Sequence, residues 1–212
     1  MAVAVVPPAV RLLAHDRGLG ARHVAGADEA GRGCLAGPLV AAAVCIDTER
    51  HLDKVLDGLD DSKRITAARR PQVAAAIIGC ARSIAVVIVP ASEIDSFGLH
   101  RSNLRALADA LAALGDLPDA RLSDGFALGD AAPPHRAIPG GDRTSAAIAA
   151  ASVIAKVTRD RFMCRVAGEY PGYGFERHVG YITPEHSAAV RAHGATPLHR
   201  LSFAAAAYGD RA

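Results

Sequence analysis

Residues 26–37, GADEAGRGCLAG, are the stretch that decides the fold. The apolar run at 22–27 predicts a strand, and it leads directly into two adjacent acids, Asp28 and Glu29. Successive side chains of a strand point to opposite faces. Both acids therefore serve one site only if the strand ends there, or if one side chain reaches round its edge.

A glycine-rich segment, Gly31-Arg32-Gly33, follows the acids. Glycine has no Cβ, so the backbone of such a segment can come close to a ligand and test a sugar for a 2′-hydroxyl. Two other interpretations compete with this one. A plain acidic turn does not explain the crowding of glycines and arginine, and a dinucleotide-binding loop would place two negative charges, Asp28 and Glu29, where a pyrophosphate should lie.

Apolar runs alternate with helical patterns along the rest of the chain, which predicts an α/β fold. The predicted strands are 22–27, 38–46, 82–89, 120–123 and 136–139. The predicted helices are 66–79, 99–114, 144–167 and 183–194. Pro71 restricts the first helix to a start near Arg70, and Thr144 or Ser145 can cap the third. We expect a loop at 171–181 and a tail from 198 that packs back on the domain.

Composition excludes several classes of protein. The 212 residues are 50% hydrophobic but only 4% aromatic, and the net charge of +2 does not by itself indicate a nucleic-acid partner. No stretch approaches the ~20 apolar residues of a membrane span, and the apolar N-terminus lacks a basic leader, so we expect neither membrane nor signal peptide. The four cysteines have no metal-ligand spacing and indicate reduced thiols in the cytoplasm. Basic residues gather in two segments, 63–70 and 156–165.

Two further acids, Asp124 and Asp142, stand at predicted element ends. Alone, Asp124 before Gly125 is typical of a turn and Asp142 of a helix cap. Strand ends of an α/β sheet gather at one edge, however, and four carboxylates there would repel one another unless cations neutralised them. Oxygen ligands favour Mg²⁺ or Mn²⁺ over zinc, and two such ions can flank a phosphodiester.

The sequence resembles the type 2 ribonucleases H (ribonuclease HII) of bacteria. The motifs that carry the resemblance occur in the family's order along nearly the whole chain: GADEAGRGCLAGP at 26–38, DDSK at 60–63, SDG at 123–125, GGD at 140–142, IAAASVIAKVTRDR at 148–161, GYIT at 180–183 and HRLSF at 199–203. The first and the fifth are long and specific.

The resemblance implies a role for each matching residue. It makes Asp28, Glu29, Asp124 and Asp142 the catalytic, metal-binding carboxylates. It implies that the backbone of Gly31, Arg32 and Gly33 reads the 2′-hydroxyl, that Tyr181 packs on the neighbouring sugar, and that Ser62 and Lys63 contact the phosphate backbone.

The implied fold is ribonuclease H-like: a five-stranded mixed sheet flanked by helices, with a catalytic core at 1–167 and a C-terminal helical extension at 168–212 in a single domain. The implied activity is cleavage of the RNA strand of RNA–DNA hybrids, and cutting 5′ of ribonucleotides embedded in duplex DNA, with Mg²⁺ or Mn²⁺ and 3′-hydroxyl and 5′-phosphate products. We expect a monomer. The alternatives are a non-catalytic hybrid-binding module and a nucleotide-binding enzyme that uses the glycine-rich loop.

The chain departs from the family pattern at Cys34, at Ser123 and Phe126 beside Asp124, and at Ile182, but at none of the four carboxylates. Other polar residues have simpler interpretations. We expect Asp160 to form an exposed ion pair with Lys156, four residues before it. We expect Asp60 and Asp61 to hold the loop that presents Lys63. The C-terminal histidines lack zinc-helix spacing, and of these His178 or His199 could meet phosphate.

Overall fold

A five-stranded mixed sheet forms the centre of the protein in the computed structural model, which describes residues 6–203 and 206–208. The strands lie in the order β3 (Ser83–Val89), β2 (Leu39–Asp47), β1 (His23–Ala30), β4 (Ala120–Asp124) and β5 (Arg136–Ile138). The pairs β3–β2 and β2–β1 are antiparallel, whereas β1–β4 and β4–β5 are parallel. The predicted five-stranded mixed sheet is therefore confirmed.

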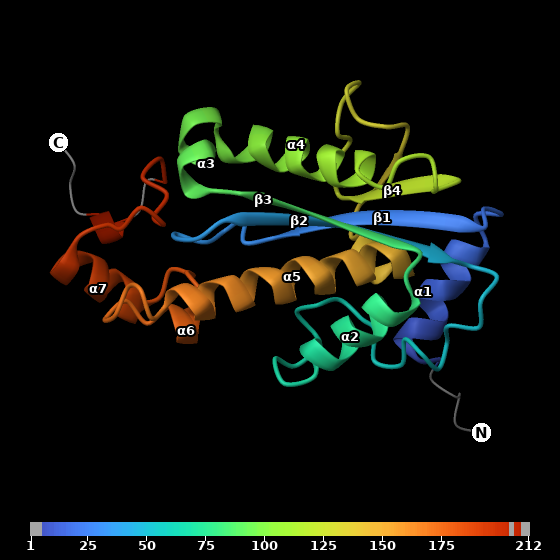
Figure 1. Cartoon of the computed structure of the whole chain (residues 1–212), viewed down its shortest axis with the longest axis horizontal. Helices are drawn as coiled ribbons and strands as arrows, with labels where there is room; N and C mark the ends of the chain where they lie inside the picture. Colours follow the sequence, from blue (N-terminus) through green and yellow to red (C-terminus); the bar gives the residue numbers. More distant parts are fainter. Residues whose placement is uncertain (1–5, 204–205, 209–212) are drawn as a thin grey trace.

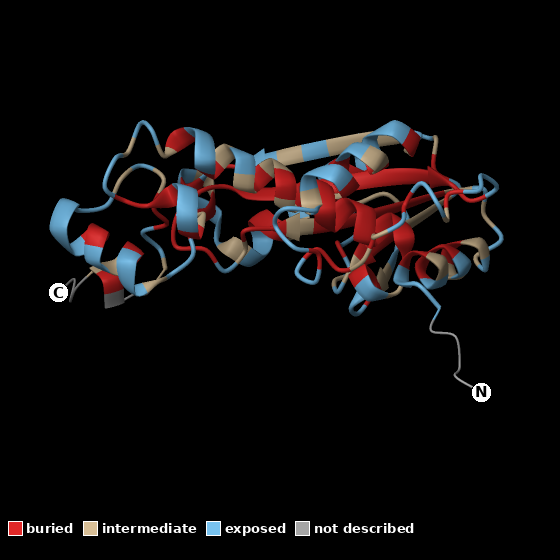
Figure 2. Cartoon of the chain, turned by 90° about the horizontal axis from the view of Figure 1, so that it is seen from below, coloured by how far each residue is buried: buried red, intermediate tan, exposed pale blue. Residues whose placement is uncertain are grey.

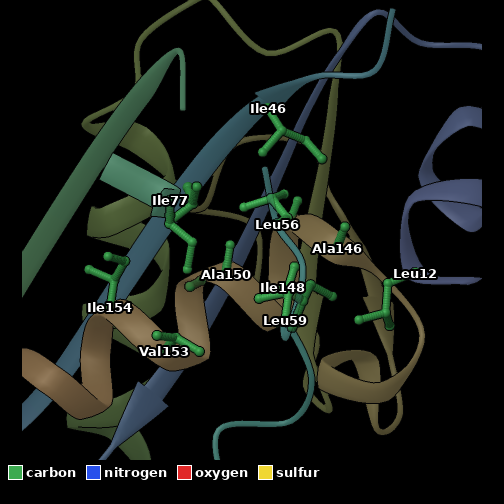
Figure 3. Packing of buried hydrophobic residues seen from close by; sticks show 14 of the residues in the cluster. Leu12, Ile46, Leu56, Leu59, Ile77, Ala146, Ile148, Ala150, Val153 and Ile154 are labelled. Atoms are coloured by element: carbon green, nitrogen blue, oxygen red, sulfur yellow. The ribbon is translucent and has the colours of Figure 1, made fainter. Parts of the chain in front are cut away.

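The long helix α5 (Ala146–Val166) crosses one face of the sheet, with α1 (Pro8–Arg17) and α2 (Arg70–Cys80) beside it (Figure 1). Its apolar side chains, including Ile148 and Ile154, meet those of β2 and of the segment after β2 (Figure 3). At Gly26 the approach is so close that a Cβ would lie 2.2 Å from the backbone nitrogen of Ile148. Gly26 is thus needed for β1 to lie directly against α5.

The other face of the sheet is covered by α4 (Leu99–Ala112), preceded by α3 (Ala91–Phe97) (Figure 1). We predicted one helix at 99–114 and missed α3, which is only seven residues long and is separated from α4 by Gly98 at φ 81°. A second cluster of buried apolar residues joins α4 to β1 and β2. The central strands are consequently buried on both faces, as Figure 2 shows.

We did not predict α1. Pro8 occupies the first turn of the helix, where a missing N–H costs nothing. The wholly buried Asp16 accepts a hydrogen bond from the backbone nitrogen of Ala147 at 2.9 Å and so ties α1 to the start of α5. Helix α2 begins at Arg70, as Pro71 indicated.

The C-terminal elements lie beyond the far end of α5 (Figure 1). They are α6 (Phe175–His178), a short helix inside the segment that we expected to be a loop, α7 (Pro184–His193) and the 3₁₀ turn η2 (Ala206–Tyr208). Thr183 caps α7 as predicted, accepting from the nitrogen of His186. Within the described residues, no helix is both long and apolar enough to cross a membrane.

Candidate active site

The two adjacent acids lie inside β1 and not after it. We predicted a strand at 22–27, but β1 continues to Ala30, with Asp28 opposite Ala42 and Glu29 opposite Ala41. The expected end of the strand before the acids is therefore wrong. Pairing with β4 stops earlier, at Ala27 and Ser123, so that from Asp28 onward this edge of β1 is open. A side chain can reach round this edge.

Asp124 and Asp142 come to the same edge from β4 and from the turn before α5. Asp124 ends β4, and its Oδ1 accepts a hydrogen bond of 2.6 Å from the nitrogen of Gly141. Asp142 lies in the 3₁₀ turn η1 (Gly141–Arg143) and is buried. It does not cap α5, because Ser145 does so, accepting from the nitrogen of Ile148 at 3.3 Å. The local explanation of Asp142 as a helix cap is thus removed.

The carboxylates destabilise one another's charged forms. Burial, and then the negative charges of Glu29 and Asp124, hold the pKa of Asp28 well above its usual value. Burial, and then the charges of Asp61 and Asp124, raise the pKa of Asp142. Burial also raises the pKa of Glu29, although Arg32 opposes the shift. A bound cation would favour the ionised form of each group and relieve this repulsion.

The predicted site residues line one cleft of about 310 Å³. All ten of them do so: Asp28, Glu29, Gly31, Arg32, Gly33, Ser62, Lys63, Asp124, Asp142 and Tyr181. Ala30, Ser152 and Lys156 complete the lining, and of these Ala30 and Ser152 were not assigned from the sequence. Ser152 lies four residues before Lys156 on α5, a helical spacing that places both on one face and could have identified it.

The two glycines of the Gly31-Arg32-Gly33 segment differ in their surroundings. Gly31 has φ 90°, and a Cβ there would lie 2.0 Å from Nε of Arg159 and 2.8 Å from the carbonyl oxygen of Pro38. A Cβ on Gly33 would meet nothing within 4 Å. Gly31 is therefore required by the protein's own packing, whereas the backbone at Gly33 is open toward the cleft.

Two arginines fix this segment in place. The wholly buried Arg159 donates hydrogen bonds to the carbonyl oxygens of Pro38, Val179 and Ala36 at 2.8–2.9 Å. Arg200, also wholly buried, donates to the carbonyl oxygen of Arg32 at 3.0 Å. The basic segments 63–70 and 156–165 predict that the residues near Lys63 and Lys156 face phosphates. This prediction is wrong for Arg159, because its charge is used inside the protein.

The side chain of Arg32 has a partner that departs from the family pattern. Its guanidinium lies 4.7 Å from the centre of the Phe126 ring, and Ser123 donates a hydrogen bond of 2.7 Å to the carbonyl oxygen of Phe126. Phe126 therefore gives Arg32 a cation–π contact at the rim of the cleft.

The segment that carries Lys63 is held by its neighbours, as predicted for Asp60 and Asp61. Asp61 accepts from the nitrogen of Lys63 at 2.9 Å, and Asp60 accepts from the nitrogen of Asp61 at 2.9 Å. The hydroxyl of Ser62 lies 2.8 Å from that of Ser152 on α5 and is buried. These contacts leave the exposed Lys63 side chain at the cleft.

Tyr181 also lines the cleft and is 42% exposed. The Lys156 ammonium is 5.3 Å from the centre of its ring. The predicted pair between Lys156 and Asp160 is present at 2.8 Å, but Asp160 is only 24% exposed and Arg70 also approaches it, at 3.5 Å. The pair is therefore part of a half-buried network that fixes Lys156 beside Tyr181.

The C-terminal histidines form an internal cluster. Nε2 of His186 lies 3.1 Å from Nε2 of His199, and the rings of His178 and His186 stack at 4.4 Å. All three are buried, and His178 also bonds to the carbonyl oxygen of Tyr173 at 2.8 Å. The expectation that His178 or His199 meets phosphate is therefore wrong.

Within the described part of the chain, no three His, Cys, Asp or Glu side chains are placed to hold a metal ion by themselves. An ion bound by the cleft carboxylates would thus take further oxygen ligands from water or substrate. Such mixed coordination is usual for Mg²⁺, which keeps several waters and commonly shares one or two carboxylates with a substrate phosphate. The donor set, which is all carboxylate, fits a hard divalent cation.

The chain is similar to known ribonucleases over most of its length. The ribonuclease HII family model matches residues 25–206. Ribonuclease HII of Salinispora arenicola (strain CNS-205) is 52% identical over 184 residues, which are 87% of this chain and 68% of that protein.

Solved structures show the same fold. Ribonuclease H2 from Pyrococcus horikoshii OT3 superposes with a TM-score of 0.74 at 27% identity, covering 86% of this chain and 94% of that chain. Bst RNase HIII in complex with Mn²⁺ superposes with a TM-score of 0.65 at 25% identity, covering 90% of this chain and 70% of that chain. Since the family model covers the cleft residues as well as the sheet, the chain belongs to the ribonuclease HII family.

Proposed function

We propose that Asp28, Glu29, Asp124 and Asp142 are the metal-binding carboxylates with which this chain cuts on the 5′ side of a ribonucleotide, leaving a 3′-hydroxyl and a 5′-phosphate. Membership of the ribonuclease HII family makes the chain a metal-dependent endoribonuclease of the ribonuclease H type, which hydrolyses the RNA strand of RNA–DNA hybrids. The observation that carries the assignment is that residues from six separate sequence motifs line one cleft.

The metals in this proposal are Mg²⁺ or Mn²⁺. Bound between the carboxylates and a substrate phosphate, two such ions would activate water and stabilise the leaving oxygen. The protein's part is to hold four carboxylates at one open strand edge despite their repulsion, which the raised pKa values of Asp28 and Asp142 reflect. The nucleotide-binding alternative is disfavoured, because the glycine-rich segment lies beside these negative charges and not beside an unopposed helix N-terminus.

Recognition of ribose is assigned to the rim formed by Gly33, Arg32 and Tyr181. Gly33 leaves its backbone open to a close ligand, and backbone amide and carbonyl groups can donate to or accept from a 2′-hydroxyl. The half-exposed ring of Tyr181 offers a flat apolar surface for the neighbouring sugar. Gly31 is needed for the packing behind this segment, because a Cβ at that position would clash with the side chain of Arg159.

Contacts to the phosphate backbone are assigned to Lys63 and Lys156. Both ammonium groups line the cleft, where they would neutralise phosphates and displace counterions. Ser62 holds the segment that carries Lys63, because its hydroxyl is engaged with Ser152.

Four further expectations remain part of the proposal. Ribonucleotide-containing duplex DNA is the second substrate, and the chain acts as a monomer. The cytoplasm is the location, in agreement with four free cysteines. The division into a core at 1–167 and an extension at 168–212 is supported by a separate apolar cluster among the C-terminal elements, although Leu35, Ala36 and Met163 of the core also belong to it.

A cleavage assay with end mapping tests the proposal. A labelled RNA–DNA hybrid is incubated with the protein in Mg²⁺, in Mn²⁺ and in excess chelator, and the product ends are identified by ligation and by phosphatase treatment. We expect cuts with 3′-hydroxyl and 5′-phosphate ends in either metal and none in chelator. Products with a 2′,3′-cyclic phosphate, or cleavage in chelator, would contradict it.

A further inference from the structure

The alternation of β1 separates the two adjacent acids. Ala25 and Ala27 belong to the apolar cluster on the α4 side of the sheet, whereas Val24 and Ala30 belong to the cluster on the α5 side. By the same alternation Glu29 projects toward the α4 face. Asp28 projects toward α5, which carries Ser152 in the lining of the same cleft. The Glu29 carboxylate must therefore turn round the open edge of β1 to join Asp124.

On the α4 side a buried amide lies close to Glu29. Asn103, in the second turn of α4, is 0% exposed. Neither its side-chain nitrogen nor its side-chain oxygen has a well-formed hydrogen bond within the described part of the protein. Glu29 projects toward the face of the sheet that α4 covers, so the Asn103 amide and the Glu29 carboxylate lie on the same side of β1. Burial raises the pKa of Glu29, and the Asn103 side chain opposes this rise, in agreement with an amide near the carboxylate.

Burying an amide without partners is unfavourable, and apolar residues surround this helix face. Leucine would satisfy the packing of α4 without that cost. An asparagine at this position therefore needs an explanation outside the stability of the core, and the nearby carboxyl group of Glu29 offers one.

We propose that Asn103 is a positioning residue, whose side-chain N–H donates to the Glu29 carboxylate and holds it at the open edge of β1. One oxygen of the carboxylate then accepts from the amide, and the other is directed toward Asp124 and the cleft. The inference rests on the proposed metal-binding role of Glu29.

The test compares Asn103→Leu with Ser102→Ala as a matched control. Ser102 is the neighbouring residue on α4, is equally buried and also lacks a hydrogen-bond partner for its hydroxyl. Asn103→Leu should lower the single-turnover cleavage rate by about 10- to 100-fold, the usual effect of removing a group that orients a metal ligand. Its Tm should be unchanged or higher, because an unpaired buried amide is removed. Ser102→Ala should leave the cleavage rate unchanged.

A double-mutant cycle with Glu29→Ala shows whether Asn103 acts through Glu29. If it does, Asn103→Leu has no further effect on the rate of Glu29→Ala. A readout independent of cleavage is the ¹H–¹⁵N signal of the Asn103 side-chain amide, identified by its loss in Asn103→Leu. We expect Glu29→Ala to shift this signal in the metal-free protein.

The outcomes separate the inference from the proposed function. Three results would each overturn the inference and leave the carboxylate assignment standing. They are a wild-type rate for Asn103→Leu, additive effects of the two substitutions in the cycle, and an Asn103 amide signal that is unchanged in Glu29→Ala. A fall in Tm with a proportionate loss of rate would assign Asn103 to folding alone. A wild-type rate for Glu29→Ala would overturn the proposed function itself.

Discussion

Replacing each of the two glycines of the Gly31-Arg32-Gly33 segment by alanine should affect a different property. Gly31→Ala should lower the stability of the protein, whereas Gly33→Ala should impair recognition of the substrate. At Gly31 the new Cβ would lie 2.0 Å from Nε of Arg159. Arg159 cannot simply move away, because it is wholly buried and donates to three carbonyl oxygens. At Gly33 the new Cβ would meet nothing of the protein.

The magnitude for Gly31→Ala follows from these contacts. Holding alanine in the left-handed region costs ~1–2 kcal/mol, and losing one hydrogen bond of the Arg159 guanidinium costs a further ~1.5–3 kcal/mol. The free energy of unfolding should thus fall by at least ~2.5 kcal/mol, which corresponds to a fall in Tm of roughly 5–10 °C for a chain of this size. For Gly33→Ala the change should stay within ~0.5 kcal/mol.

The assay pairs thermal denaturation with cleavage of a hybrid. Gly33→Ala should keep the wild-type Tm yet lose cleavage, since its methyl group stands where the sugar must approach. Gly31→Ala should have a lower Tm than the wild type, and its cleavage activity should fall only in proportion to the fraction of protein that is unfolded. A wild-type Tm for Gly31→Ala would refute the packing argument, and full activity for Gly33→Ala would refute a close sugar at this position.

Three further outcomes are expected. Asp28→Asn, Glu29→Gln and Asp124→Asn should each slow cleavage by at least about 100-fold, or ~2.7 kcal/mol of barrier. Urea denaturation should show no loss of stability in these variants, because repulsion among the carboxylates is relieved. Near-normal turnover of a variant in saturating Mg²⁺ would show that the substituted residue does not belong to the metal site. Hybrid affinity should fall steeply with salt, and Lys63→Ala should reduce the slope of log K against log salt by about one; a flat wild-type slope would contradict phosphate contacts. Burial and His186 lower the pKa of His199 from 6.5 to about 4. Between pH 7 and pH 5 the histidine is therefore protonated in the unfolded chain but not in the folded chain, and the free energy of unfolding should fall by ~2 kcal/mol over this range. The same pH dependence in His199→Gln would show that other groups cause the loss.

The motifs and the family resemblance that they carry identified most of the site, because two adjacent acids followed by a glycine-rich segment leave a clear trace in the sequence. What the local pattern could not show was pairing with distant segments. The predicted strand ended at residue 27, before Asp28, yet β2 pairs with β1 up to Ala30 and keeps both acids within it.

Long-range contacts also decided the roles of the basic residues. Arg159 and Lys156 stand three positions apart on α5 and looked alike as members of one basic segment. Only the fold reveals that Arg159 turns inward to bind three carbonyl groups, while Lys156 faces the cleft. Likewise the histidines proved internal because Phe175 and Tyr173 surround them, a contact that no spacing rule encodes.

The most direct test of the central claim compares two duplexes that differ in a single oxygen atom. One DNA duplex carries one ribonucleotide, and the other carries its 2′-deoxy counterpart at the same position. With Mg²⁺ or Mn²⁺ we predict one cut on the 5′ side of the ribonucleotide in the first duplex and no cut in the second. Equal cleavage of both duplexes would show that the cleft does not read the 2′-hydroxyl, and the assignment of Gly33, Arg32 and Tyr181 would be wrong.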